Sequence, residues 1–162
     1  AIWIWNQATL HFPDSHQVVD WYHGTQHLAV AAHALKAEDT PAYQRWFNSH
    51  EKALYQGHAA RIADELEQAA GQQPEQAGDL RREAGYFRDN QHRMNYLEMR
   101  EEEWPIGSGR VESGGKQYKA RFCGPGMRWS RAGAERLLPI RSAILSKRFD
   151  ELWAKVYNAP QA

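Results

Sequence analysis

One acidic residue, Glu112, lies in a segment of small residues that could present it to a metal ion. Residues 106–113 have the sequence Ile-Gly-Ser-Gly-Arg-Val-Glu-Ser. Ser108 could cap a helix that begins here, and the glycines would let a nucleic-acid backbone approach closely. A carboxylate one turn into that helix could bind a hard divalent cation. The alternative is structural, because a first-turn Glu also interacts favourably with the helix dipole, and this segment alone leaves both open.

The residues around Glu112 carry a strong excess of cations. Residues 107–148 contain 10 Lys and Arg against 2 Asp and Glu, whereas residues 1–106 contain 9 against 16, although the whole chain has a formal net charge of zero. Clustered cations release counterions when they meet phosphates, so this segregation is typical of a surface that binds a polyanion. The alternative is a solvated basic face that docks on the acidic part of the same chain. The expected DNA-contacting residues are Arg110, Lys116, Lys119, Arg121, Arg128, Trp129, Arg131 and Arg136.

Aromatic residues are interleaved with these cations. Trp129, Tyr118 and Phe122 could stack on unpaired bases. However, Tyr118 and Phe122 lie four residues apart, a spacing that on a helix is more often used for core packing. The cations are therefore the better evidence for DNA binding.

A second polar group, Asp20 and His23, follows the apolar pair Val18 and Val19. An acid at the end of a strand with a His three residues later could contact metal, DNA or the Glu112 helix. Equally, Asp20 could cap the next helix beside a buried, hydrogen-bonded His. His23 and His27 are four residues apart, which suits zinc, but the Glu of a zincin motif is missing, so zinc is disfavoured.

Other catalytic motifs are absent from the sequence. Gly114-Gly115-Lys116 is followed by Gln rather than Ser or Thr, which excludes a P-loop. All eight His precede residue 93, and no serine has a nucleophile-elbow context, so no Ser-His-Asp triad is indicated.

The elements that would position these residues are mostly helical. Apolar spacing predicts helices over residues 2–10 and 22–36, with a brief strand over 17–21 between them. Thr40-Pro41 begins another helix, Gly57 interrupts it, and residues 71–78 form an exposed link. A near-3.5-residue repeat over 80–97 predicts one long helix that packs as half of a coiled pair. Further helices follow residue 105, and the last is expected to pack its apolar face, Phe149, Leu152, Trp153, Val156 and Tyr157, into a core.

Length and composition exclude several classes of protein. A chain of 162 residues with many aromatics suits a compact fold, and the lone Cys123 can form no internal disulfide. No apolar run approaches the roughly 20 residues that span a bilayer, and no signal peptide is recognisable, so we expect a cytoplasmic protein. Because the first helix begins without a cap or an initiator Met, we also expect a piece of a longer protein.

Several separated motifs resemble the ISKra-type insertion-sequence transposases. They cover most of the chain, in the same order along it. The motifs are Val19-Asp20-Trp21-Tyr22-His23, His27-Leu28, residues 105–113, Lys116, Arg121, Gly126-Met127-Arg128-Trp129-Ser130, Gly133-Ala134, Leu137-Leu138, Arg141 and residues 146–153.

The resemblance implies a mostly helical chain with a small β element, the C-terminal portion of a ribonuclease-H-like α/β core. Residues 1–36 would belong to that core, 37–104 would be a helical insertion, and 105–162 would carry the catalytic Glu and the basic helices. Glu112 would be the last acid of an Asp, Asp, Glu set that binds two Mg²⁺ ions for DNA cleavage and strand transfer. Asp20, His23 and Ser108 would support that site.

The sequence departs from the family pattern at the two aspartates. The strand that carries the first is missing, the second would precede Ala1, and Asp20 matches a later motif instead. We therefore expect the chain to be catalytically incomplete in isolation. Its expected partners are transposon-end and target DNA and further copies of itself, in the bacterial cytoplasm near the nucleoid. The alternatives are a DNA-binding module without catalysis, or a helical interaction protein that uses residues 80–104.

Overall fold

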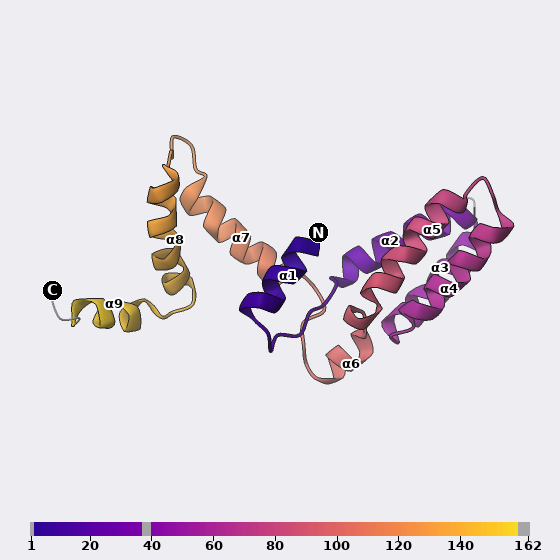
Figure 1. Cartoon of the computed structure of the whole chain (residues 1–162), viewed down its shortest axis with the longest axis horizontal. Coiled ribbons are helices and arrows are strands. Elements are labelled where there is room, and N and C mark those ends of the chain that lie inside the picture. The colour runs from indigo at the N-terminus through magenta and orange to yellow at the C-terminus, as the bar shows by residue number, and fades with distance from the viewer. Residues whose placement is uncertain (1, 37–39, 159–162) are drawn as a thin grey trace. The chain divides into compact units, whose positions relative to one another are not determined.

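The computed structural model of the chain describes residues 2–36 and 40–158 (Figure 1), which fall into two compact units divided between Ser108 and Gly109. No helix in the described part is long and apolar enough to cross a membrane. The first unit contains α1 (Ile2–His11), α2 (Trp21–Leu35), α3 (Pro41–Tyr55), α4 (Ala59–Gln72), α5 (Ala77–Asn90), a 3-10 helix (Gln91–Arg93) and α6 (Tyr96–Glu101). The second contains α7 (Gly109–Phe122), α8 (Arg131–Leu145) and α9 (Phe149–Tyr157).

The core of the first unit lies among α2, α3, α4 and α5, and the α4–α5 contact is the most extensive. Ile62 and Leu66 of α4 are fully buried, as are Leu80 and Phe87 of α5. Alanines at helical spacing between these residues carry little volume, which lets the two helices run closely side by side (Figure 1).

The helix boundaries of this unit follow local chemistry, as the sequence predicts. Thr40 caps α3, because its hydroxyl accepts a hydrogen bond from the Tyr43 N–H at 3.1 Å, and Pro41 occupies the first turn. Gly57 separates α3 from α4 with a φ of 84°, which is in the left-handed region that glycine tolerates best. The predicted helices near residues 2–10 and 22–36 are also confirmed.

The predicted strand over residues 17–21 is wrong, and with it the α/β ribonuclease-H-like core. No strand or sheet is present among the described residues, which are helical or irregular. Val19 is extended, but its N–H donates to the Arg93 carbonyl at 3.0 Å, whereas the N–H of Trp21 donates to the Ile106 carbonyl at 2.8 Å. Arg93 ends the 3-10 helix and Ile106 lies in the segment before α7, so the two acceptors are on separate segments and no ladder of successive hydrogen bonds forms.

The single long helix predicted over residues 80–97 is also wrong. After α5 ends at Asn90, the chain passes through the 3-10 helix before α6 begins. Met94, which follows the 3-10 helix, and Tyr96, the first residue of α6, are fully buried. The apolar repeat therefore continues because the turn delivers these side chains to the core, not because the helix continues.

The second unit has very little interior of its own. The Tyr118 hydroxyl lies 2.6 Å from the Ser142 hydroxyl and joins α7 to α8. Ala143 is the only buried residue among its described positions. The apolar face of α9 is largely exposed, with Trp153 at 58% and Val156 at 63%, so the prediction that this face packs into a core is wrong for the described residues.

Gly24 and Gly85 should respond in opposite directions to replacement by Ala. A Cβ on Gly24 would lie 2.8 Å from the hydroxyl of Tyr96, a fully buried ring that has no space to move, whereas a Cβ on Gly85 would meet nothing within 4 Å. Gly24→Ala should therefore destabilise the fold by about 1–3 kcal/mol. Gly85→Ala should stabilise it by about 0.5–1 kcal/mol, because alanine favours the helix. Urea unfolding measures both, and a stable Gly24→Ala variant would contradict this packing.

Candidate nucleic-acid interface

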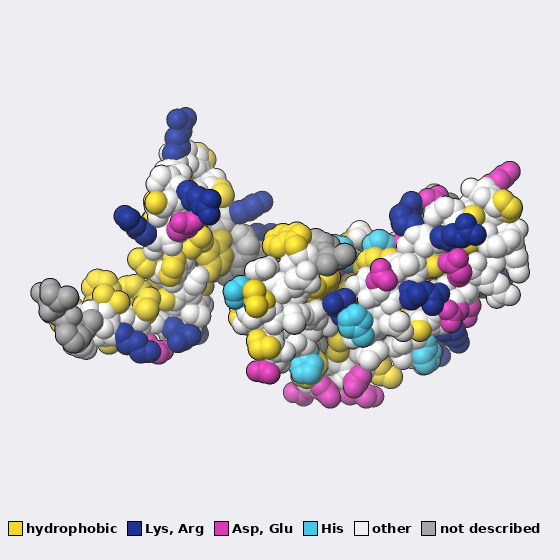
Figure 2. Space-filling view, in the orientation of Figure 1, with side chains coloured by type: hydrophobic (Ala, Val, Ile, Leu, Met, Phe, Trp, Pro, Cys, Tyr) yellow, Lys and Arg dark blue, Asp and Glu magenta, His cyan; other side chains and the backbone are white. Residues whose placement is uncertain are grey.

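The cations predicted to contact DNA are exposed on the second unit. Figure 2 shows Lys and Arg side chains projecting from this unit with few acidic ones between them, whereas Asp and Glu gather along one edge of the first unit. Within the described part of the chain, five of them form no hydrogen bond or ion pair. These are Arg110, Lys116, Lys119, Arg128 and Arg136.

The other members of the predicted set are already engaged. The guanidinium of Arg131 donates to Glu135 at 2.8 Å, one turn along α8. The guanidinium of Arg121 lies over the Trp129 ring, 5.5 Å from its centroid, and the indole N–H of Trp129 donates to the Phe122 carbonyl at 3.1 Å. Trp129 is 38% exposed, so part of its ring remains open to a ligand. Tyr118 and Phe122 are half-buried between the helices.

Glu112 is exposed in the first turn of α7. Lys116 and Lys119 follow it at four and seven residues, so the three side chains share one stripe of the helix. A magnesium site needs several oxygen ligands, but no group of three or more His, Cys, Asp or Glu in the described residues could hold a metal ion. The residues present therefore do not make a Mg²⁺ site around Glu112.

Asp20 and Ser108 are brought together in the first unit. One Asp20 carboxylate oxygen accepts the N–H of His23 at 3.1 Å and caps α2, as the structural alternative predicts. The other accepts the backbone N–H of Ser108, and the Ser108 hydroxyl also bonds this carboxylate. His23 lies beside Asp20, with its Nδ1 3.1 Å away, but its side chain is 61% exposed, so the expectation of a buried His is wrong. Asp20 thus fixes the loop that precedes α7.

The Asp20 contacts make a specific prediction about acid stability. Burial raises the pKa of this carboxyl, but hydrogen bonds from Ser108 and His23 outweigh burial, and the net pKa lies below its ordinary value. The stabilisation is therefore fully present above the unfolded-state pKa and is lost as the pH falls below about 4. Asp20→Asn should be less stable than wild type at neutral pH, and the difference should shrink in acid. Urea midpoints measured across pH 2–6 check this, and a constant difference would contradict it.

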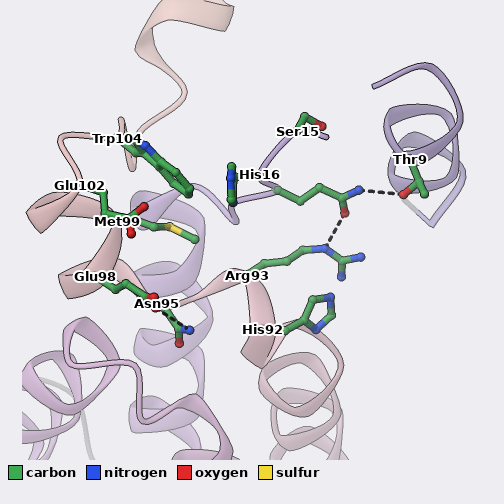
Figure 3. A pocket seen from close by; sticks show the side chains of 11 residues that line it. Thr9, Ser15, His16, His92, Arg93, Asn95, Glu98, Met99, Glu102 and Trp104 are labelled. Carbon is green, nitrogen blue, oxygen red and sulfur yellow. Dashed lines mark hydrogen bonds between the residues drawn. The ribbon is translucent and has the colours of Figure 1, made fainter. Parts of the chain in front are cut away.

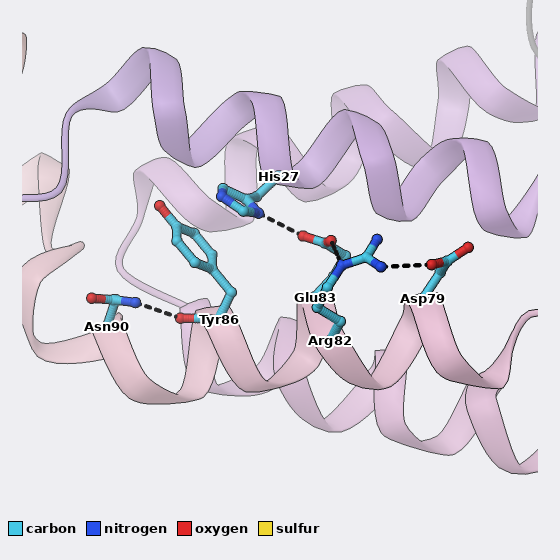
Figure 4. A network of polar contacts seen from close by, with 6 residues as sticks. All are labelled: His27, Asp79, Arg82, Glu83, Tyr86 and Asn90. Atoms are coloured by element: carbon cyan, nitrogen blue, oxygen red, sulfur yellow. Dashed lines mark hydrogen bonds and ion pairs between the residues drawn. The ribbon is translucent and has the colours of Figure 1, made fainter. Parts of the chain in front are cut away.

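A histidine and a buried acid, which the sequence motifs did not indicate, join α2 to α5 (Figure 4). His27 Nδ1 lies 2.6 Å from a carboxylate oxygen of Glu83, whose side chain is only 3% exposed. Arg82 donates to the other oxygen at 3.1 Å, and the Tyr86 ring stacks on His27 with centroids 3.4 Å apart. Burial, and to a lesser extent the charges of Glu83 and Asp20, raises the pKa of Tyr86 to about 12.

A sequence signal for this pair exists. Glu83 lies between Leu80 and Phe87 in the apolar repeat of α5, where a carboxylate requires a buried partner. Because His27 and Glu83 come from different helices and bond to one another, we interpret the pair as a structural link between α2 and α5.

Comparison of the chain with protein-family models, with curated proteins and with solved structures found no match in any of the three.

Proposed function

We propose that this chain acts on DNA as part of an insertion-sequence transposase, and that α7 and α8 bind the DNA backbone. The observation that carries the proposal is the set of five exposed cations, Arg110, Lys116, Lys119, Arg128 and Arg136, which pair with no acid in the described residues. Exposed cations without partners can contact phosphates at a small cost in free energy, because no internal ion pair must be broken.

The surface of α7 is also shaped for close approach. Gly114 and Gly115 lie inside the helix, where each costs about 1 kcal/mol relative to Ala, and a Cβ on either would meet nothing within 4 Å. Packing within the second unit therefore gives no reason for them. A flat, side-chain-free patch beside Lys116 would let a phosphate backbone reach the helix surface.

The salt dependence of DNA binding tests this proposal. The whole chain should bind a fluorescent duplex of about 30 base pairs, and its affinity should fall steeply between about 50 and 200 mM NaCl. If three to five of the cations each contact a phosphate, a plot of log affinity against log salt should have a slope of about −3 to −5. The absence of binding at the lowest salt concentration, or a slope near zero, would contradict the proposal.

A role in strand cleavage is the second candidate, and it rests on the place of Glu112. This carboxylate is exposed on the stripe that also carries Lys116 and Lys119, where bound DNA would pass. The resemblance to ISKra-type transposases gives it the role of last acid in a Mg²⁺ site, to which residues outside this chain would have to contribute the other carboxylates.

A nicking assay with a longer protein, in which this chain is joined to a segment that supplies the other two carboxylates, tests this role. Glu112→Gln should abolish Mg²⁺-dependent cleavage yet leave DNA affinity unchanged or slightly higher, because a negative charge is removed. Glu135→Gln, which removes an acid from α8 instead, is the control and should still cleave. If the Glu112→Gln protein cleaves, the catalytic role is wrong. If the longer wild-type protein binds DNA without cleaving it, the chain is a non-catalytic DNA-binding module.

A further inference from the structure

A hollow of about 520 Å³ opens on the first unit, in the part of the chain that precedes the basic helices (Figure 3). Its walls come from the end of α1 and the segment that follows it, from the turn after α5, and from α6 with the residues that follow it. None of the residues that we assign to DNA binding lines it. It is therefore a separate feature that the proposed function does not explain.

Two carboxylates, those of Glu98 and Glu102, line one wall of this hollow. Glu98 lies within α6 and Glu102 directly after its last residue; both are exposed, and Figure 3 shows them on the same side of the pocket, near Met99. Glu98 accepts a hydrogen bond from the amide of Asn95 at 3.3 Å. Within the described residues neither carboxylate has an ion pair.

Arg93, a cation that also lines the hollow, does not neutralise these acids. Its Nε donates to the side-chain carbonyl of Gln17 at 2.9 Å, and its guanidinium lies over the Trp5 ring, 4.5 Å from the centroid. In Figure 3 it extends away from Glu98 and Glu102. The guanidinium therefore binds α1 to the rest of the unit and forms no ion pair with either carboxylate.

An apolar surface adjoins the carboxylates. The rings of Trp104 and His16 lie against each other with centroids 3.7 Å apart, and Met99 is 7% exposed beside them. These three residues also line a second, smaller hollow of about 150 Å³, which is completed by Val18 and Pro105. A ligand in this place would meet carboxylates on one side and an aromatic and aliphatic surface on the other.

We propose that this hollow binds an organic cation, a guanidinium or alkylammonium group carried on an apolar stem. The charged group lies between Glu98 and Glu102, which accept its N–H donors, and the stem lies on Trp104 and Met99. A carboxylate pair favours this charge and rejects phosphates, while an indole face attracts a cation and also covers its methylene groups. The ligand chemistry is shared by a free amine or guanidine and by a Lys or Arg side chain of a peptide.

Calorimetric titration of the whole chain with butylguanidinium tests the proposal. We expect saturable binding, and binding by the neutral isostere butylurea that is weaker by about tenfold or more, because it lacks the charge. A blocked Gly-Arg-Gly peptide distinguishes the sources of the ligand. Binding as tight as that of butylguanidinium indicates a peptide side chain, whereas clearly weaker binding indicates a free small cation.

Paired charge variants separate this site from general attraction to an acidic protein. The double variant Glu98→Gln, Glu102→Gln should weaken butylguanidinium binding about tenfold or more. The control variant Glu75→Gln, Asp89→Asn makes the same change in charge at exposed residues outside the hollow. Its affinity for butylguanidinium should stay within about twofold of wild type. Equal weakening by both pairs, equal binding of butylurea, or no saturable binding would overturn the proposal. DNA affinity does not enter this measurement, so its outcome is independent of the proposed function.

Discussion

DNA binding should weaken by about 10- to 100-fold at about 100 mM salt when Arg110, Lys116 and Lys119 are replaced together by Gln. These three side chains are exposed on α7 and pair with no acid in the described part of the chain. Each lost phosphate contact lowers the number of counterions that are released when the protein binds DNA. The slope of log affinity against log salt should therefore become shallower by about 2–3. Fluorescence anisotropy with one duplex at several salt concentrations measures both quantities.

The control for this experiment changes the same charge elsewhere. Arg45, Lys52 and Arg100 are exposed on the first unit, and replacing them by Gln also removes three positive charges. This variant should bind within about threefold of wild type with an unchanged slope, because these side chains do not belong to the proposed DNA-binding helices α7 and α8. Similar losses in both variants would mean that net charge, and not the α7 surface, determines binding. Arg131→Gln should have a smaller effect than Lys119→Gln, since Arg131 is already paired with Glu135.

The largest effect on stability is expected for Phe87→Ala. Phe87 is fully buried on α5 within the core that α4 and α5 share. Removing its ring should lower the free energy of unfolding by about 3–5 kcal/mol, because apolar burial is lost and a cavity remains. Urea unfolding followed by circular dichroism measures this loss. Secondary structure that is already lost without urea would agree with the prediction.

The matched control is Leu97→Ala on α6. Leu97 is 39% exposed and belongs to the same near-3.5-residue repeat from which the long helix was predicted. Its replacement should cost less than about 1 kcal/mol, since little apolar area is removed from contact. If Phe87→Ala and Leu97→Ala lower the free energy of unfolding equally, then α6, and not only the α4–α5 contact, stabilises the core.

Features fixed by neighbouring residues could be predicted from the sequence. The cap of α3 by Thr40, the break at Gly57 and the cap of α2 by Asp20 each depend on contacts within a few residues. The excess of cations over residues 107–148 was equally visible, and the exposure of these side chains follows from their charge.

Features set by distant contacts could not be predicted. The apolar segment Val18-Val19 suits either a strand or a buried loop, and the choice depends on whether another extended segment lies beside it. The repeat over residues 80–97 shows which side chains are buried but not that the backbone turns after Asn90. The pairing of His27 with Glu83 joins residues 56 positions apart, so only the isolated acid in an apolar repeat was available as a signal.

The small interior of the second unit has a consequence for how it recognises a ligand. Helices of 14 and 15 residues, α7 and α8, are marginal in water unless tertiary packing supports them, and Ala143 alone is buried among the described residues of this unit. Their amide hydrogens should exchange with solvent far faster than those of α4 and α5. A bound partner would slow that exchange, and part of the binding free energy would be consumed in ordering the helices, which favours rapid release over long residence.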